Sequence, residues 1–175
     1  GVSTFRWLRD GTPIAGATAQ SYTLVAADSG TTTTFEVTPE AATGATPGSA
    51  VVSPVGVTVV NSAPTASAVT ISDDNGGTII VGVTLTGNYS YSDFDGDLEG
   101  VSTFRWLRDG TPIAGATAST YTLVAADSGT TTTFEVTPEA ATGATPGSAV
   151  VSPVGVTVVN SAPVASSVKI GRAHV

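Results

Sequence analysis

The 175-residue sequence has no cysteine and no methionine, and its only histidine is His174, next to the last residue. Without cysteine the chain cannot form disulfides or bind a metal through thiolates. Serine and threonine are abundant, but the chain has no cysteine and only the near-terminal His174, so none has a usable partner to activate it as a nucleophile. Aromatic residues make up 6% of the chain, so few rings are present to stack on a sugar. We therefore expect no enzyme activity and assign no role to the histidine.

Basic residues are also scarce. Lysine and arginine together number 6 against 14 acidic residues, which gives a net charge of −8 and a pI near 4.2. Binding to phosphate groups needs clustered lysine and arginine, so nucleic acid and anionic membranes are disfavoured as partners. The longest apolar run, 78–83, is far shorter than the roughly 18 residues of a membrane span. We expect no membrane insertion.

The chain repeats itself at an offset of 99 residues. Residues 1–64 and 100–163 are identical except at two neighbouring positions, Gln20/Ser119 and Ser21/Thr120. A long unit copied almost unchanged is typical of modular arrays, which supply length, valency or spacing. We expect an incomplete copy at 1–62, a complete copy at 63–160 and the start of a third at 161–175, so that the sequence is a fragment of a longer protein.

The last residues depart from the repeat. The sustained departure begins at Lys169, where the earlier copy has Thr70. The final run, Ile170–Val175 (IGRAHV), looks like translated sequencing-adapter DNA, and the alternative is a divergent third copy.

Alternating apolar and polar residues predict antiparallel strands, and no window has the 3.6-residue period of a helix. Residues 81–91 place one apolar face inward, and 103–107 place Phe104 and Trp106 inward. The inward residues expected of 81–91 are Val81, Val83, Leu85, Gly87, Tyr89 and Tyr91, and the outward residues expected of 103–107 are Arg105 and Leu107.

Turn residues divide the remaining strands. Asp109-Gly110 and Asp127-Ser128-Gly129 predict turns, and Pro153 restricts the last strand, around 150–159, to an edge or a bulge. Tyr121, Leu123, Thr132, Phe134 and Val136 share the inward parity, and a sheet-face ion pair is expected between Arg105 and Glu135. About seven short strands at regular spacing predict an all-β, antiparallel β-sandwich. Residues 1–62 lack the first two strands, and linker length argues against their borrowing those of 65–99.

Trp106, followed by Tyr121-Thr122-Leu123 and then Asp127-Ser128-Gly129, resembles the signature of immunoglobulin-like (Ig-like) domains. The whole unit, with its Asn160–Pro163 linker, resembles the bacterial Ig-like tandem repeats of large surface adhesins and other cell-envelope proteins. The resemblance implies an Ig-like sandwich. The sheet-bridging cysteines of antibody domains are absent, and Thr131 stands where a tyrosine corner needs tyrosine, so no antibody-like recognition role carries over.

One segment has the composition of a cation site. Four acidic residues occupy alternate positions of this segment, on either side of Gly96. They are Asp93, Asp95, Asp97 and Glu99. Calcium prefers six to eight oxygen ligands on a flexible loop, and four crowded carboxylates repel one another without a counterion. We expect these four residues to bind Ca²⁺; the alternative is a solvated acidic turn.

The position of this loop supports the expectation. In an Ig-like sandwich it lies beside the entry linker, residues 61–64, and Asp28 of the preceding copy is expected to face it. Acidic loops on both sides of a joint resemble the cadherin arrangement, in which Ca²⁺ stiffens the junction. Asp73 and Asp74 are weaker candidates, because Asp-Asp-Asn-Gly-Gly is typical of a plain turn.

These observations favour a non-catalytic structural spacer in a bacterial extracellular adhesin, located on the cell surface, whose partners are neighbouring repeats. The alternative is a carbohydrate- or protein-binding module of a secreted enzyme or surface protein. An exposed aromatic cluster on a sheet face would favour the binding module, whereas a surface of threonine and serine favours the spacer.

Overall fold

The computed structural model describes residues 1–165, 167 and 171 of the chain. In these residues the protein is all-β with antiparallel sheets, as predicted, and its only helices are two three-residue 3-10 turns. The prediction that Ile170–Val175 derives from adapter DNA concerns residues that, except for Gly171, lie outside the described part of the chain.

The chain forms two compact units, and each contains separate stretches of sequence. Unit 1 comprises Gly1–Thr65, Tyr91–Ser102 and Pro138–Ser148. Unit 2 comprises Ala66–Ser90, Thr103–Thr137 and Ala149–Val175. The domain boundaries expected at residues 62 and 160 stay predictions.

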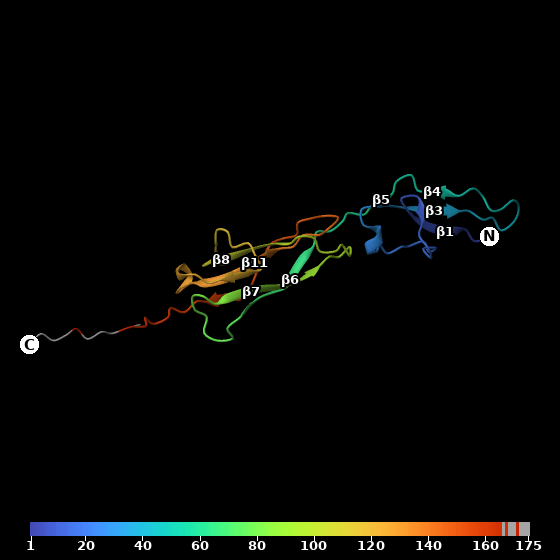
Figure 1. The fold of residues 1–175 in the computed structure, drawn as a ribbon. Coiled ribbons are helices and arrows are strands. Elements are labelled where there is room, and N and C mark those ends of the chain that lie inside the picture. The colour runs from blue at the N-terminus through green and yellow to red at the C-terminus, as the bar shows by residue number, and fades with distance from the viewer. Residues whose placement is uncertain (166, 168–170, 172–175) are drawn as a thin grey trace, which may run out of the picture. The chain divides into compact units, whose positions relative to one another are not determined.

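Unit 1 contains one antiparallel sheet built from the first sequence copy (Figure 1). The strands run in the order β2-β1-β3-β4, and β5 also pairs with β3. Its elements are β1 (Thr4–Arg9), β2 (Thr12–Pro13), η1 (Ala26–Asp28), β3 (Thr32–Thr38), β4 (Val51–Val52) and β5 (Val57–Thr58).

A two-residue hairpin turn sets the register between β1 and β2. Asp10 and Gly11 both have positive φ, at 45° and 78°. This is the conformation that Asp-Gly adopts in the hairpin turns that match the twist of antiparallel strands. It pairs Arg9 with Thr12. The second copy repeats the turn at Asp109-Gly110, as the sequence predicted.

Unit 2 contains two sheets. A three-stranded sheet has the order β10-β7-β6, and a five-stranded sheet has the order β12-β11-β8-β9 with β13 also paired to β11 (Figure 1). The first residue of β6 and the last two of β7 belong to unit 1. The elements are β6 (Thr65–Asp73), β7 (Thr84–Ser92), β8 (Thr103–Arg108), β9 (Thr111–Pro112), β10 (Thr120–Thr122), η2 (Ala125–Asp127), β11 (Thr131–Thr137), β12 (Val150–Val151) and β13 (Val156–Thr157).

The core of unit 2 draws side chains from both sheets. Val83 and Leu85 come from β7 and its approach, and Trp106 and Phe134 come from β8 and β11. Most of the predicted inward parity is confirmed, because these residues and Leu123, Thr132 and Val136 are buried. The interruption expected at Pro153 is also present, since β12 and β13 are separate strands on either side of it.

Two parts of the predicted pattern are wrong. Val81 is 41% exposed, because β7 begins only at Thr84 and Gly82, with φ at 93°, breaks the alternation before it. Leu107 was expected on the outward face of the strand, yet it is buried. It lies across from Thr133 on β11 and Pro112 on β9, so neighbouring strands flank it on both sides.

Identical residues are buried to different extents in the two copies. Leu123 is 2% exposed and its counterpart Leu24 is 45% exposed. The strands of residues 1–60 pair only with one another in the described part of the chain, whereas β7 pairs with β10. The first copy therefore does not borrow β6 and β7, as expected.

We predict that limited proteolysis removes residues 1–60 first and leaves a resistant fragment beginning near Asn61. Burial of an apolar side chain such as Leu85 contributes about 1.5–3 kcal/mol, and the first copy has no equivalent of β7 among its paired strands. N-terminal sequencing and mass spectrometry of a protease time course identify the fragment. Equal resistance of residues 1–60 and 100–160 would contradict the prediction.

Candidate functional site

The acidic loop begins where β7 ends and is organised by its own first carboxylate. Asp93 Oδ1 accepts the backbone N–H groups of Asp95, at 2.8 Å, and Asp97, at 3.2 Å. Gly96 lies at the bend with φ at 82°, a conformation that glycine adopts without strain. Asp93 therefore closes the loop, and the next two carboxylates are free to contact other segments of unit 1.

Asp95 and Asp97 contact the linker. The N–H of Ser62 donates to Asp95 Oδ2 at 2.5 Å, and the side-chain amide of Asn61 donates to Asp97 Oδ2 at 2.7 Å. The hydrogen bond from the Ser62 backbone is the largest cause that holds the pKa of Asp95 below its ordinary 3.8. The expectation that the acidic loop lies beside residues 61–64 is confirmed.

Asn61 joins three segments of unit 1. Its Nδ2 donates to Ser29 Oγ of the first copy, at 3.0 Å, as well as to Asp97. Its Oδ1 accepts the N–H of Ala144, at 2.6 Å. The second oxygen of Asp97 accepts the hydroxyl of Thr142 at 2.6 Å. We call this set, Ser29, Asn61, Asp97, Thr142 and Ala144, the linker network.

Gly143 is required by the close approach of this loop. A Cβ built on it would lie 2.4 Å from both Asn61 Oδ1 and Asp97 Oδ2. Its counterpart in the first copy, Gly44, has a similar φ of 92° but meets no atom within 4 Å. The two glycines thus share a backbone conformation and differ in what surrounds them.

The fourth acidic residue contacts a different segment. Glu99 Oε1 accepts the hydroxyl of Ser102 at 2.5 Å, and the backbone of Glu99 forms an isolated bridge with Ala140. In the described residues no three histidine, aspartate or glutamate side chains converge to hold a metal ion. One carboxylate oxygen of the acidic loop, Asp93 Oδ2, is buried without a hydrogen-bond partner. The Ca²⁺ hypothesis stays a prediction, with Asp93 as its best ligand.

The expectation that Asp28 faces the joint is wrong. Asp28 is fully buried and accepts hydrogen bonds from Arg9, Tyr22 Oη and the N–H of Val25. Burial alone raises the pKa of Asp28, but these three donors outweigh it and leave the pKa below 3.8. The carboxylate ties η1 to β1, and the neighbouring Ser29 supplies the contact with Asn61 instead.

Asp73 and Asp74 form a plain turn, the reading that the sequence favoured. Asp73 Oδ1 accepts the N–H groups of Asn75 and Gly76, at 3.0 and 2.5 Å. Asp74 Oδ1 accepts the N–H of Thr84. Asp73 therefore satisfies backbone donors of the turn itself, and Asp74 satisfies one at the start of β7.

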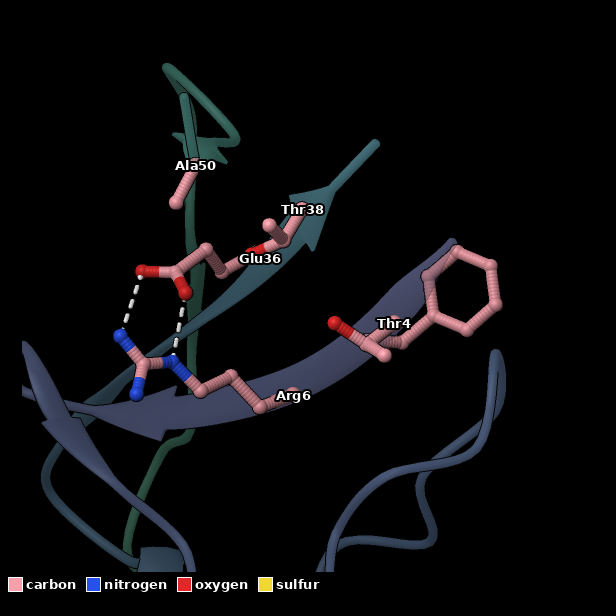
Figure 2. Close-up of a pocket in the computed structure, with 6 residues that line it drawn as sticks. Thr4, Arg6, Glu36, Thr38 and Ala50 are labelled. Carbon is pink, nitrogen blue, oxygen red and sulfur yellow. Dashed lines mark hydrogen bonds and ion pairs between the residues drawn. The ribbon is translucent and has the colours of Figure 1, made fainter. Parts of the chain in front are cut away.

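The ion pair expected between Arg105 and Glu135 is present, and Arg6 and Glu36 form the same pair in the first copy. Figure 2 shows the two hydrogen bonds from Arg6 to Glu36, at 2.5 and 3.1 Å, in a shallow hollow beside Ala50. Because Glu36 engages the guanidinium, Arg6 offers no free cation to a ligand in this hollow.

Comparison with known proteins finds no family model that matches this chain and no curated relative. Within the described residues, no helix is long and apolar enough to span a membrane.

We predict that Asn61→Ala speeds hydrogen exchange at the Ala144 amide about fivefold, the equivalent of about 1 kcal/mol for one hydrogen bond. Asn160→Ala is the matched control, because Asn160 occupies the same position in an identical linker and is exposed. NMR-detected exchange in the full chain measures both variants.

A second matched pair tests the same network. Gly143→Ala should speed exchange at the Ala144 and Ser62 amides, and Gly44→Ala, with its similar backbone strain, should leave them unchanged. Equal effects of the two alanines, or no effect of Asn61→Ala, would contradict the role of the network.

Proposed function

We propose that this chain is part of a non-catalytic structural spacer, an extender repeat of a bacterial extracellular surface adhesin. The observation that carries the proposal is the linker network. Its hydrogen bonds join Ser29 of the first copy, the linker and two loops that border the strands of the second copy. A spacer needs defined joints between its repeats, and this network supplies contacts at one joint.

The linker itself supports the proposal. It is short, residues 61–64, and its proline has a fixed φ and is buried. Gly147 approaches so closely that a Cβ on it would overlap the carbonyl of Pro64. A short linker with a buried proline leaves few conformations for the chain between repeats.

The surface of the complete copy supports a spacer rather than a binding module. Among the described residues 65–160, Phe94 is the one aromatic residue that is largely exposed to solvent, at 84%. Trp106 and Phe134 are fully buried, and Tyr89, Phe104 and Tyr121 pack against the core. A carbohydrate-binding face needs several exposed rings, and this copy presents one, on a loop.

The fold is interpreted as an Ig-like sandwich. Two residues on which the resemblance rests have structural roles: Trp106 is a fully buried member of the core, and Asp127 is fully buried. Asp127 accepts hydrogen bonds from Arg108, Tyr121 Oη and the N–H of Val124. These ties join β8, β10 and η2 in a chain that has neither the disulfide nor the tyrosine corner of antibody domains.

Small-angle scattering of arrays containing one to four copies of residues 64–162 tests the spacer. We predict that the length grows in proportion to the number of copies, well above the scaling of a compact globule. Replacing every linker asparagine with alanine should shorten the mean length while each copy keeps its melting temperature. Growth on the compact scaling in the unmodified arrays would contradict the proposal.

We also propose that Ca²⁺ binds the acidic loop. Asp93, Asp95 and Asp97 have no basic partner within the described residues, because the ion pairs there involve Arg6, Arg9, Arg105 and Arg108 with other acids. Their mutual repulsion is reduced only by hydrogen-bond donors, none of which carries a positive charge. Asp93 Oδ2 supplies a buried oxygen without a partner.

Calorimetric melting of the full chain in Ca²⁺ and in chelator tests this proposal. We predict a higher melting temperature in Ca²⁺, corresponding to about 2.7 kcal/mol at 100 times the dissociation constant. Asp93→Asn should remove the difference while keeping the Oδ1 that closes the loop, and Asp73→Asn in the plain turn is the control. Identical melting of the unmodified chain in both conditions would contradict Ca²⁺ binding.

A further inference from the structure

The two sequence copies present the same sheet face in two environments. In the second copy Trp106, Phe134 and Val136 are fully buried. Their counterparts Trp7, Phe35 and Val37 are only half-buried on the sheet of unit 1. Since the residues are identical, the difference comes from what covers the face.

In the second copy β6 and β7 cover this face. Leu85 and Val69 enter the core, and Gly87 lies against the ring of Phe134, where a Cβ would be 2.4 Å from the ring carbons. Gly87 also donates its N–H to the carbonyl of Ser119, at 2.8 Å. The strand pair β6–β7 is therefore held over this face both by apolar contacts and by backbone pairing of β7 with residues 119–123.

The first copy keeps the edge that would receive such a cover. Residues 21–23, the counterparts of β10, form no strand, and the side chain of Leu24 is 45% exposed. The two positions at which the copies differ, Gln20 and Ser21, correspond to Ser119 and Thr120. Those residues pair with β7 through their backbones, and both side chains are exposed. The substitutions therefore leave the acceptor intact.

We propose that the open sheet face of residues 1–60 is an acceptor for a strand pair with the sequence of Thr65–Ser92, donated by another copy of the repeat. The pair β6–β7 within this chain already covers its own second copy, so the donor must be a separate one. The acceptor binds the donor by the contacts described for the second copy: Leu85 fills the space beside the aromatic rings, Gly87 lies flat on Phe35, and β7 extends the edge at residues 21–23. This inference is independent of the spacer function.

The test uses the full chain and a synthetic peptide with the sequence of residues 64–99. Isothermal titration should show one peptide per chain. Hydrogen exchange should show protection of the Leu24 amide increasing at least tenfold, because the N–H of its counterpart Leu123 donates to the carbonyl of Val83. Residues 1–60 should then resist protease as well as residues 100–160 do.

Two variant peptides make the test specific. Gly87→Val should bind at least tenfold more weakly, because its side chain would overlap the ring of Phe35. Ser90→Ala, which changes an exposed residue of the same strand, should bind like the unmodified peptide. In the chain, Leu24→Asp should abolish binding and leave residues 100–160 folded. No binding of the unmodified peptide, equal binding of the Gly87→Val peptide, or new protection only in residues 100–160 would overturn the proposal.

Discussion

The contact between Gly87 and Phe134 is the constraint on which the core of the second copy depends. A glycine in the middle of a strand ordinarily weakens it, because it has no side chain to pack and loses more backbone entropy. Here the missing side chain lets the ring of Phe134 lie directly against the backbone of β7. Phe134 in turn lies 5.0 Å from Trp106 and 5.5 Å from Phe104, measured between ring centroids. The three rings can pack against one another because Gly87 leaves room for Phe134 beside β7.

A hydrogen-bonded cluster around a buried aspartate is present in both copies and does not depend on the cover that β6 and β7 provide. Asp28 and Asp127 accept the same hydrogen bonds from an arginine, a tyrosine and a backbone amide, and both are fully buried. The cluster therefore forms whether or not β6 and β7 cover the sheet. Its partners lie within 19 residues of one another, so it closes short loops at little entropic cost. Local ties preserve the shape of the first sheet, whereas burial of its aromatic residues requires strands that come from outside that copy.

Residue patterns predicted much of the fold because the side-chain period of a strand is visible in the sequence. The inward set at Trp106 and Phe134 and the turn at Asp109-Gly110 follow from alternation and backbone preference alone. Val81 was misassigned because the alternation continues before the strand begins, and only the φ of Gly82 shows the break. Leu107 was misassigned because parity tells which face a residue occupies but not how far the neighbouring strands bury its side chain.

The candidate site was predicted in part. We predicted that the acidic loop lies beside the linker from the strand order expected of an Ig-like sandwich, and the structure places both in unit 1. The participation of Asn61 and Ser29 could not be predicted. Asn61 and Asn160 lie in identical linkers, so no local signal separates the residue that forms the network from the one that is exposed. Asp28 was the more obvious candidate because it is charged. Charge alone, however, does not distinguish a buried carboxylate that holds neighbouring segments together from one that binds a ligand.

The chemistry of the side-chain amide explains why asparagine suits this linker. Asn61 donates to Ser29 and Asp97 and accepts from Ala144, so it uses its donors and its acceptor at once. An aspartate could only accept and would repel Asp97, and a serine has one donor hydrogen for two partners. A lysine would pair with Asp97 but could not accept the N–H of Ala144, which would lose its partner. Asparagine therefore completes the hydrogen bonds of the linker without neutralising the negative charge of Asp93, Asp95 and Asp97.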